Sequence, residues 1–137
     1  MDYEPKVRKL EMIQGIMTRM AQNSFSLKGW AITLVSGIFI LASRDAKVTF
    51  FLIAYIPTIL FWFLDSYYLQ LERQFKVLYI SDSIKDPNRI DFDITRPETN
   101  YDDKTKYTQC LFAVTEWLFY IPIAVLIAVV IIITIPK

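Results

Sequence analysis

The chain has 137 residues, and 54% of them are hydrophobic, which exceeds the roughly 45–50% found in soluble domains. Its formal net charge of +1 gives no electrostatic basis for binding nucleic acid. It contains no histidine and a single cysteine, Cys110, which excludes an intrachain disulfide, histidine-based triads and metal sites built from imidazole or paired thiolates. We therefore expect neither a cofactor nor an enzymatic activity.

Three charge-free runs account for the apolar composition. They cover residues 29–43, 48–64 and 117–136, and a membrane-spanning helix needs roughly 20 mainly apolar residues. The third run reaches that length alone, and the first two reach it when their polar flanks snorkel. The alternative is a buried helical hairpin, but a chain this small has too little surface to cover three such helices. We predict an all-α membrane protein with three spans.

Residues 1–26 precede the first span and are mostly polar. Pro5 suits a first helical turn, and apolar residues recur at helical spacing from Val7 to Met20. This pattern predicts an amphipathic helix over residues 5–26, which either lies in the membrane interface or packs on neighbouring helices below the membrane. Because polar residues come before the apolar run, we interpret the first span as a retained signal anchor.

The first two spans are predicted to form a hairpin. The first covers residues 27–43, with Lys28 as an anchor at headgroup level, and residues 44–47 make a tight external turn. The second span covers residues 48–68 and contains Pro57, which is expected to kink the helix or leave a carbonyl unpaired.

The second span is expected to continue as a cytoplasmic helix over residues 69–80. Residues 81–107 hold seven acids and five bases and form the predicted cytoplasmic polar segment, with a weak strand pattern at residues 90–94. The third span is assigned to residues 108–137. Near its start, Cys110 is expected to pack as a small apolar side chain.

Basic residues are unequally distributed between the two sides of the predicted spans. Lysine and arginine number five in the N-terminal segment up to and including Lys28, two in residues 44–47, seven in residues 65–107 and one at the C-terminus. Under the positive-inside rule, three spans place the N-terminus and the 65–107 segment in the cytoplasm and the C-terminus outside. We expect the protein in the inner (plasma) membrane, with its working surface in the cytoplasm.

Three ionisable side chains fall at the borders of the predicted spans: Asp65, Glu116 and Lys28. Charged groups close to the hydrocarbon are energetically unfavourable and are therefore candidates for a functional site. One interpretation is that the two carboxylates line a polar opening. The other is that they form interfacial hydrogen bonds or pair with Lys28, Arg19 or Arg73.

Two sets of small residues lie at helix-packing spacing. The first span carries Gly29, Thr33 and Gly37, and the third carries Ala124 and Ala128. Small residues on one face let helices approach closely, either within one subunit or between subunits.

A cytoplasmic charged cluster is predicted from Arg19, Glu72, Arg73 and Lys76. Such a cluster either binds an anionic headgroup or a nucleotide, or is simply a solvated helix face.

Two stretches carry a resemblance to known proteins: LEMIQ and RMAQNSFSLKGW within residues 10–30, and WFLDSYYLQLERQF at residues 62–75. They are similar to a widespread family of small, uncharacterised bacterial inner-membrane proteins, over roughly the first 80 residues. More loosely, the chain resembles the SLATT-type small membrane effectors of bacterial defence systems. Those effectors pair a short N-terminal helix with a two-helix hairpin and a cytoplasmic helix, and are thought to assemble and breach the membrane. They usually lack a third span, and no residue's role is carried over from them.

Three hypotheses about function follow. The first is a homo-oligomeric effector in the bilayer that forms a pore or disrupts the membrane when a cytoplasmic protein partner signals, with the resemblance implying a role in antiphage defence. The second is a scaffold or regulatory subunit that anchors a partner protein at the membrane. The third, a transporter or membrane enzyme, is disfavoured because three spans contain no inverted repeat.

Overall fold

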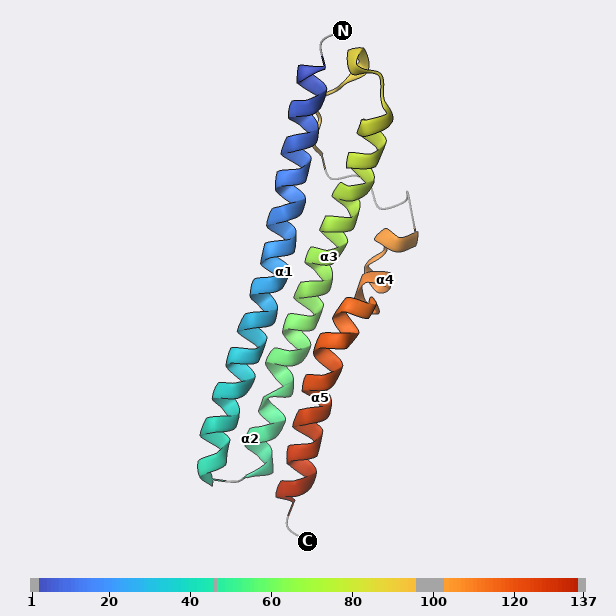
Figure 1. Ribbon diagram of the computed structural model, residues 1–137. Helices are drawn as coiled ribbons and strands as arrows, with labels where there is room; N and C mark the ends of the chain where they lie inside the picture. Colours follow the sequence, from blue (N-terminus) through green and yellow to red (C-terminus); the bar gives the residue numbers. More distant parts are fainter. Residues whose placement is uncertain (1–2, 46, 96–102, 136–137) are drawn as a thin grey trace.

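The computed structural model describes residues 3–45, 47–95 and 103–135, and the regular secondary structure within these ranges is entirely helical. Residues 96–102 of the predicted polar segment and residues 136–137 of the predicted third span lie outside them. Two long antiparallel helices, α1 and α3, run side by side, and α5 lies along one half of their length (Figure 1). The helices are α1 (Glu4–Asp45), α2 (Val48–Ile53), α3 (Tyr55–Ile84), α4 (Tyr107–Leu111) and α5 (Val114–Thr134), with 3-10 turns η1 (Pro87–Arg89) and η2 (Asp103–Thr105).

The predicted amphipathic helix and the first span form one uninterrupted helix, α1. It contains 42 residues, which corresponds to roughly 60 Å at 1.5 Å per residue. No proline follows Pro5 within it, so no backbone hydrogen bond is lost along its length. The first half of α1 packs against α3, with Ile13 fully buried, which corresponds to the second of the two arrangements predicted for this segment. The residues that α1 buries are Lys9, Ile13, Ala31, Val35 and Ala42.

The second candidate span is broken near its start. The helix α2 ends at Ile53 and α3 begins at Tyr55, with Ala54 fully buried between them. Pro57 follows closely, and its ring excludes the helical hydrogen bond to the carbonyl four residues earlier, that of Ile53. The hydroxyl of Thr58 donates to the carbonyl of Ala54 at 2.9 Å. The irregularity predicted from Pro57 is therefore present, as a break at Ala54.

The helix α3 continues far beyond the apolar run and ends at Ile84, a few residues later than predicted. Residues 90–95, where the sequence weakly predicted a strand, have no regular secondary structure. The backbone of this segment lies instead against α1, where the carbonyl of Asp91 accepts a hydrogen bond from the ammonium of Lys9. The strand prediction was wrong because alternation on its own does not supply a neighbouring strand, and the described ranges contain none.

The helix of the third candidate span begins later than the predicted boundary at residue 108. The short α4 ends at Leu111 and α5 begins at Val114, with extended backbone at Ala113 (φ −63°, ψ 146°) between them. The indole N–H of Trp62 donates to the carbonyl of Leu111 at 3.0 Å, so a contact with α3 satisfies a carbonyl at this break. No proline or glycine marks the break in the sequence, and the pattern of apolar residues could not locate it.

Three helical stretches are long and apolar enough to cross a membrane: α1, α2 together with α3, and α5. The core between them is small and centres on Val35, Ala54 and Ile127. Large apolar side chains cover the outside instead, as for Leu118 and Ile132, which are 72% and 69% exposed. An apolar exterior around a small core is what a bundle embedded in lipid requires, so the fold supports the prediction of membrane-spanning helices.

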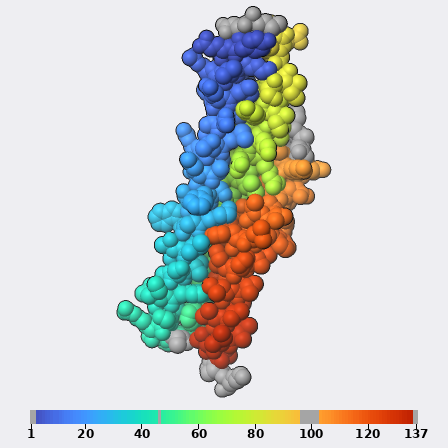
Figure 2. All heavy atoms as spheres, in the orientation of Figure 1, coloured from blue at the N-terminus to red at the C-terminus, as the bar shows by residue number. Residues whose placement is uncertain are grey.

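The half of the molecule away from α5 is a two-helix stalk, formed by residues 4–26 of α1 and residues 69–84 of α3. In Figure 2 the upper half shows these two helices packed together, whereas α5 covers the lower half. The stalk carries most of the charged side chains of both helices, so it is the part of the structure best suited to water.

Candidate functional site

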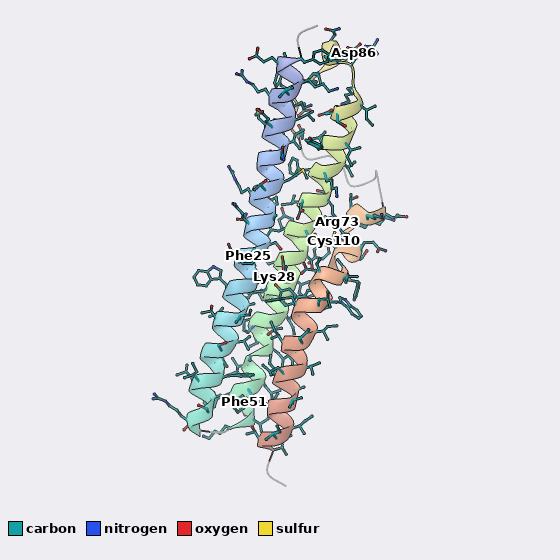
Figure 3. The ribbon with its side chains drawn as sticks, viewed as in Figure 1. Phe25, Lys28, Phe51, Arg73, Asp86 and Cys110 are labelled. Atoms are coloured by element: carbon teal, nitrogen blue, oxygen red, sulfur yellow. The ribbon has the colours of Figure 1, made fainter. Side chains whose placement is uncertain are left out.

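A cluster of polar side chains lies where α1, α3 and the start of α5 come together, at the level of Lys28 (Figure 3). Lys28 comes from α1, Asp65 from α3 and Glu116 from the first turn of α5. Ser24 lies one helical turn before Lys28, and Tyr120 lies one turn after Glu116, so each neighbour faces the same junction. We call these five side chains the junction cluster.

Asp65 is the centre of the junction cluster. It is fully buried and forms an ion pair with the ammonium of Lys28. The hydroxyl of Ser24 donates to Oδ1 of the same carboxylate, and the hydroxyl of Tyr120 donates to Oδ2 at 3.0 Å. Hydrogen bonds from all three donors stabilise a carboxylate that would otherwise be strongly disfavoured away from water.

Glu116 is buried almost as completely, with 1% of its surface exposed. Its Oε1 lies 3.4 Å from the ammonium of Lys28, so one lysine faces two carboxyl groups. Its Oε2 is also buried and receives no hydrogen bond from the described residues. The position of Glu116 in the first turn of α5 is favourable for a negative charge because the helix dipole is positive there.

Lys28 reaches the cluster along an aromatic surface. Its ammonium lies 5.8 Å from the ring centroid of Phe119 and 6.0 Å from that of Tyr120, distances at which rings attract cations. Its ammonium also donates to Ser24 at 3.1 Å. A Ser–Lys pair can perform nucleophilic catalysis when the lysine is neutral and accepts the serine proton. Here the serine proton is donated to Asp65, and the ammonium is required to balance the carboxylates, so the geometry favours a structural or charge-holding role.

The sequence left three basic residues open as partners of Asp65: Lys28, Arg19 and Arg73. In the structure, Asp65 pairs with Lys28. Arg19 is exposed on α1, and Arg73 turns away from the junction cluster. The guanidinium of Arg73 donates to the carbonyl of Lys104 at 2.9 Å and lies 3.7 Å from the sulfur of Cys110. The pKa of the Cys110 thiol is raised, because the effect of burial outweighs the opposite effect of the neighbouring Arg73.

The cytoplasmic charged cluster predicted from the sequence draws its members from two helices, α1 and α3. Arg19 belongs to α1 and is exposed, Glu72 is half-buried on α3, and Lys76 is exposed. The guanidinium of Arg73 donates a hydrogen bond to the carbonyl of Lys104, which precedes α4 in the sequence. The structure therefore brings together Lys28, Asp65 and Glu116, whereas within the described ranges no ion pair joins Arg19, Glu72, Arg73 and Lys76.

The two sets of small residues face different surroundings. A Cβ added at Gly29 or Gly37 would meet no other atom within 4 Å, and Thr33 is exposed, so this set faces away from the chain's own helices. Ala124 and Ala128 are half-buried on the inner side of α5. The carbonyl of Ala124, for example, accepts a hydrogen bond from the hydroxyl of Tyr55 at 3.1 Å.

A second buried charge cluster, at the end of the stalk, was missed by the sequence analysis. Lys9 pairs with Asp82 at 2.7 Å, and Lys85 contacts the other oxygen of Asp82 at 2.6 Å. Burial on its own would raise the pKa of the Asp82 carboxyl, but hydrogen bonds and charges from Lys85 and Lys9 outweigh burial and hold the pKa below its ordinary value. The ammonium of Lys6 donates to the carbonyls of Ser83 and Lys85 at the end of α3, where a helix favours positive charge.

The sequence contained one weak sign of this second cluster. Lys9 lies four residues before Ile13 on the face that packs against α3, so a lysine occupies a position of the buried stripe. A charge on such a stripe requires a partner, but the partner lies in a segment that the sequence analysis had treated as solvated.

The described residues contain no group of three or more acidic, cysteine or histidine side chains that could hold a metal ion. No protein-family model, curated protein or solved structure matches the chain.

Proposed function

We propose that this protein is a homo-oligomeric integral membrane protein of the bacterial inner membrane, whose assembly permeabilises the bilayer when a cytoplasmic partner engages the stalk. The N-terminus and stalk lie in the cytoplasm, the C-terminus lies outside, and the protein carries out no enzymatic reaction. The observation that carries the proposal is the outward face of α1 defined by Gly29, Thr33 and Gly37.

That face lies on the opposite side of α1 from its packed face. At 3.6 residues per turn, Ala31 and Val35 share one side of the helix, and both are buried against the rest of the chain. Gly29 and Gly37 fall on the other side, with open space around them. Small residues facing lipid gain little from packing, whereas the same residues allow a second backbone to approach closely.

A hollow continues this face toward the stalk. It is shallow and largely open to the surroundings, with a volume of about 490 Å³, and it is lined by Thr18, Ala21, Gln22, Phe25 and Ser26 of α1. The Phe25 side chain is 79% exposed beside small and polar neighbours, so it forms a projection next to a depression. Two copies related by a closed symmetry would place the projection of each copy near the depression of the other.

Assembly is needed for permeabilisation because the single bundle is filled. Val35, Ala54 and Ile127 are 5%, 0% and 0% exposed, and they occupy the space between α1, α2 and α5. Close packing of this kind leaves no lumen at the centre of the bundle, and the cavity of about 260 Å³ between α3 and α5 has a mainly apolar lining. A conducting path would therefore have to form between copies.

The test measures mass and leakage in defined membranes. The wild type reconstituted in nanodiscs should have the mass of an oligomer. In liposomes at high protein density, where mass action favours assembly without the partner, it should release a trapped dye. Gly37→Leu should shift the protein toward monomer and abolish leakage, while Thr49→Leu, which adds the same side chain at an exposed position of α2, should change neither. A monomeric wild type would overturn the proposal, and an oligomer unaffected by Gly37→Leu would remove the α1 face from it.

A membrane scaffold is the second candidate, and the stalk is the observation that favours it. Lys9 and Asp82 join the ends of α1 and α3 through a shielded ion pair, which keeps the two helices together far from the candidate spans. A rigid projection of this kind is suited to holding a partner protein. The scaffold would be favoured over the effector if the wild type is oligomeric but releases no dye, whether or not the proposed cytoplasmic partner is present.

A further inference from the structure

The junction cluster contains more acid than base. Lys28 is the only base within salt-bridge distance of Asp65 or Glu116 among residues 3–45, 47–95 and 103–135. With both carboxyl groups ionised, the cluster would carry one uncompensated negative charge among almost fully buried side chains. Such a charge is strongly disfavoured away from water, so another positive charge is required.

The arrangement of the oxygens indicates where that charge belongs. Asp65 already receives hydrogen bonds from three donors, whereas Oε2 of Glu116 receives none from the described residues. The ammonium of Lys28 lies within ion-pair distance of both carboxyl groups, so Glu116 and Asp65 are held around one cation. Two negative carboxylates held in this way repel each other. A proton on one of them removes the repulsion.

We propose that the junction cluster is a proton-binding site, in which Glu116 is protonated while Lys28 balances the remaining charge on the carboxylate of Asp65. The proton comes from hydronium in the surrounding water: an O–H bond forms at Glu116 while one O–H bond of hydronium breaks and leaves a water molecule. The cluster is then neutral overall.

The groups around Glu116 support this assignment from every element that packs against it. Lys28 faces it from α1, and Asp65 of α3 pairs with the same ammonium. Tyr120 lies one turn away on α5 and donates to Asp65, and the buried Cys110 belongs to the preceding helix α4. Tyrosine and cysteine are neutral in such surroundings. None of these groups adds a positive charge, and the start of α5 supplies only the partial positive charge of the helix dipole. The proton therefore remains the simplest means of neutralising the cluster.

Because the cluster joins α1, α3 and α5, proton binding is coupled to their packing. Loss of the proton would leave net negative charge at the junction and weaken the attachment of α5. The folded state therefore holds a proton that the unfolded state releases more easily, and stability should fall as the pH rises. Glu116→Gln keeps the shape of the protonated acid and should remove this dependence.

Infrared difference spectroscopy of the full chain in nanodiscs provides the direct test. At neutral pH the wild type should show the carbonyl stretch of a protonated carboxylic acid, shifted in heavy water and lost as the pH is raised. Glu116→Gln should abolish the band, and Glu72→Gln, at a half-buried carboxyl of the stalk, should preserve it. If Glu116→Gln fails to insert, the carboxyl carbon resonances of isotopically labelled wild type report the same protonation.

A wild type without this band at neutral pH, or a band that survives Glu116→Gln, would overturn the proposal. A small metal cation is the competing ligand, and replacing sodium by choline distinguishes it. A melting temperature that depends on sodium in the absence of the acid band would assign the site to the metal ion instead. None of these outcomes depends on the oligomeric state, so this proposal and the proposed function can fail separately.

Discussion

Lys9 of α1 and Asp82 of α3 form an ion pair at the end of the stalk, with 2.7 Å between Nζ and Oδ2 and side chains that are only 3% and 1% exposed. Lys85 contacts the same carboxylate at 2.6 Å, but its side chain is 47% exposed. Removing one partner of a shielded pair destabilises by about 3–5 kcal/mol, whereas an exposed pair contributes about 0–1 kcal/mol. The two lysines should therefore contribute unequally to the stability of the stalk.

Substituting Lys9 by methionine should destabilise the stalk by about 3 kcal/mol or more, because the change leaves a buried carboxylate with only its exposed partner. Lys85→Met is the matched control and should have an effect of about 1 kcal/mol or less. Hydrogen exchange of the α1 and α3 amides in the stalk, measured in detergent, reports both changes. Equal effects of the two substitutions would mean that burial does not distinguish the lysines.

Acid should weaken the stalk through Asp82. Its pKa is held below the ordinary value in the folded protein, so its contribution to stability is complete above the pKa of the unfolded chain, about 4, and is lost as the pH falls through the lower folded value. Thermal melts followed by circular dichroism between about pH 7 and pH 3 should show this loss in the wild type and a smaller loss in Asp82→Asn. Asp45→Asn, at an exposed position of α1, should behave as the wild type does.

Composition and charge-free runs predicted the all-helical fold and the three candidate spans, because the requirement for about 20 apolar residues leaves few alternatives. Pro57 predicted the irregularity in the second of them, since proline acts on its own helix. The pairing of Lys9 with Asp82 could not be predicted, because it depends on how far α1 and α3 slide past each other. The break at Ala113 could not be predicted either, because it depends on a hydrogen bond from Trp62 of another helix to the carbonyl of Leu111.

The junction cluster was predicted only in part, because its contacts also depend on how the helices pack against one another. Asp65, Glu116 and Lys28 were recognised as charges at the ends of apolar runs, but the sequence did not choose between Lys28, Arg19 and Arg73 as the partner. Ser24 and Tyr120 were not identified as members of the cluster, since neither residue type is unusual at the end of an apolar helix. Their part becomes visible only in the hydrogen bonds to Asp65.

Asp65→Asn should lower the melting temperature of the detergent-solubilised protein, because it leaves the Lys28 ammonium without its strongest partner. The expected loss is about 3–5 kcal/mol for a shielded pair. The double substitution with Lys28→Met should be less destabilising than the sum of the two single substitutions, because the pair is then removed as a unit. Additive effects in this cycle would show that Asp65 and Lys28 do not interact.

Ile127→Ala should destabilise the bundle by about 2–5 kcal/mol, since it opens a cavity in the small core beside Val35 and Ala54. Ile127 is fully buried, whereas Ile132 on the same helix is 69% exposed. Ile132→Ala is therefore the control and should have a much smaller effect. The melting temperatures of both variants in one detergent decide the comparison, and similar values would place Ile127 on the lipid-facing surface instead.

The topology can be tested with reporter fusions, one after Lys137 and one near residue 100. The excess of basic residues before the first span and in the 65–107 segment places both of these regions in the cytoplasm under the positive-inside rule. Three spans then place the C-terminus outside, because each crossing reverses the side. A fusion near residue 100 should be active only with a cytoplasmic reporter, and a fusion after Lys137 only with an external one. As a control, neutralising Arg44 and Lys47 in the turn should leave both results unchanged, since it increases the existing bias. A cytoplasmic C-terminus would contradict the three-span arrangement and indicate two or four spans. If residue 100 is also cytoplasmic, α5 (Val114–Thr134) does not cross the membrane once, despite being the most apolar of the three candidates.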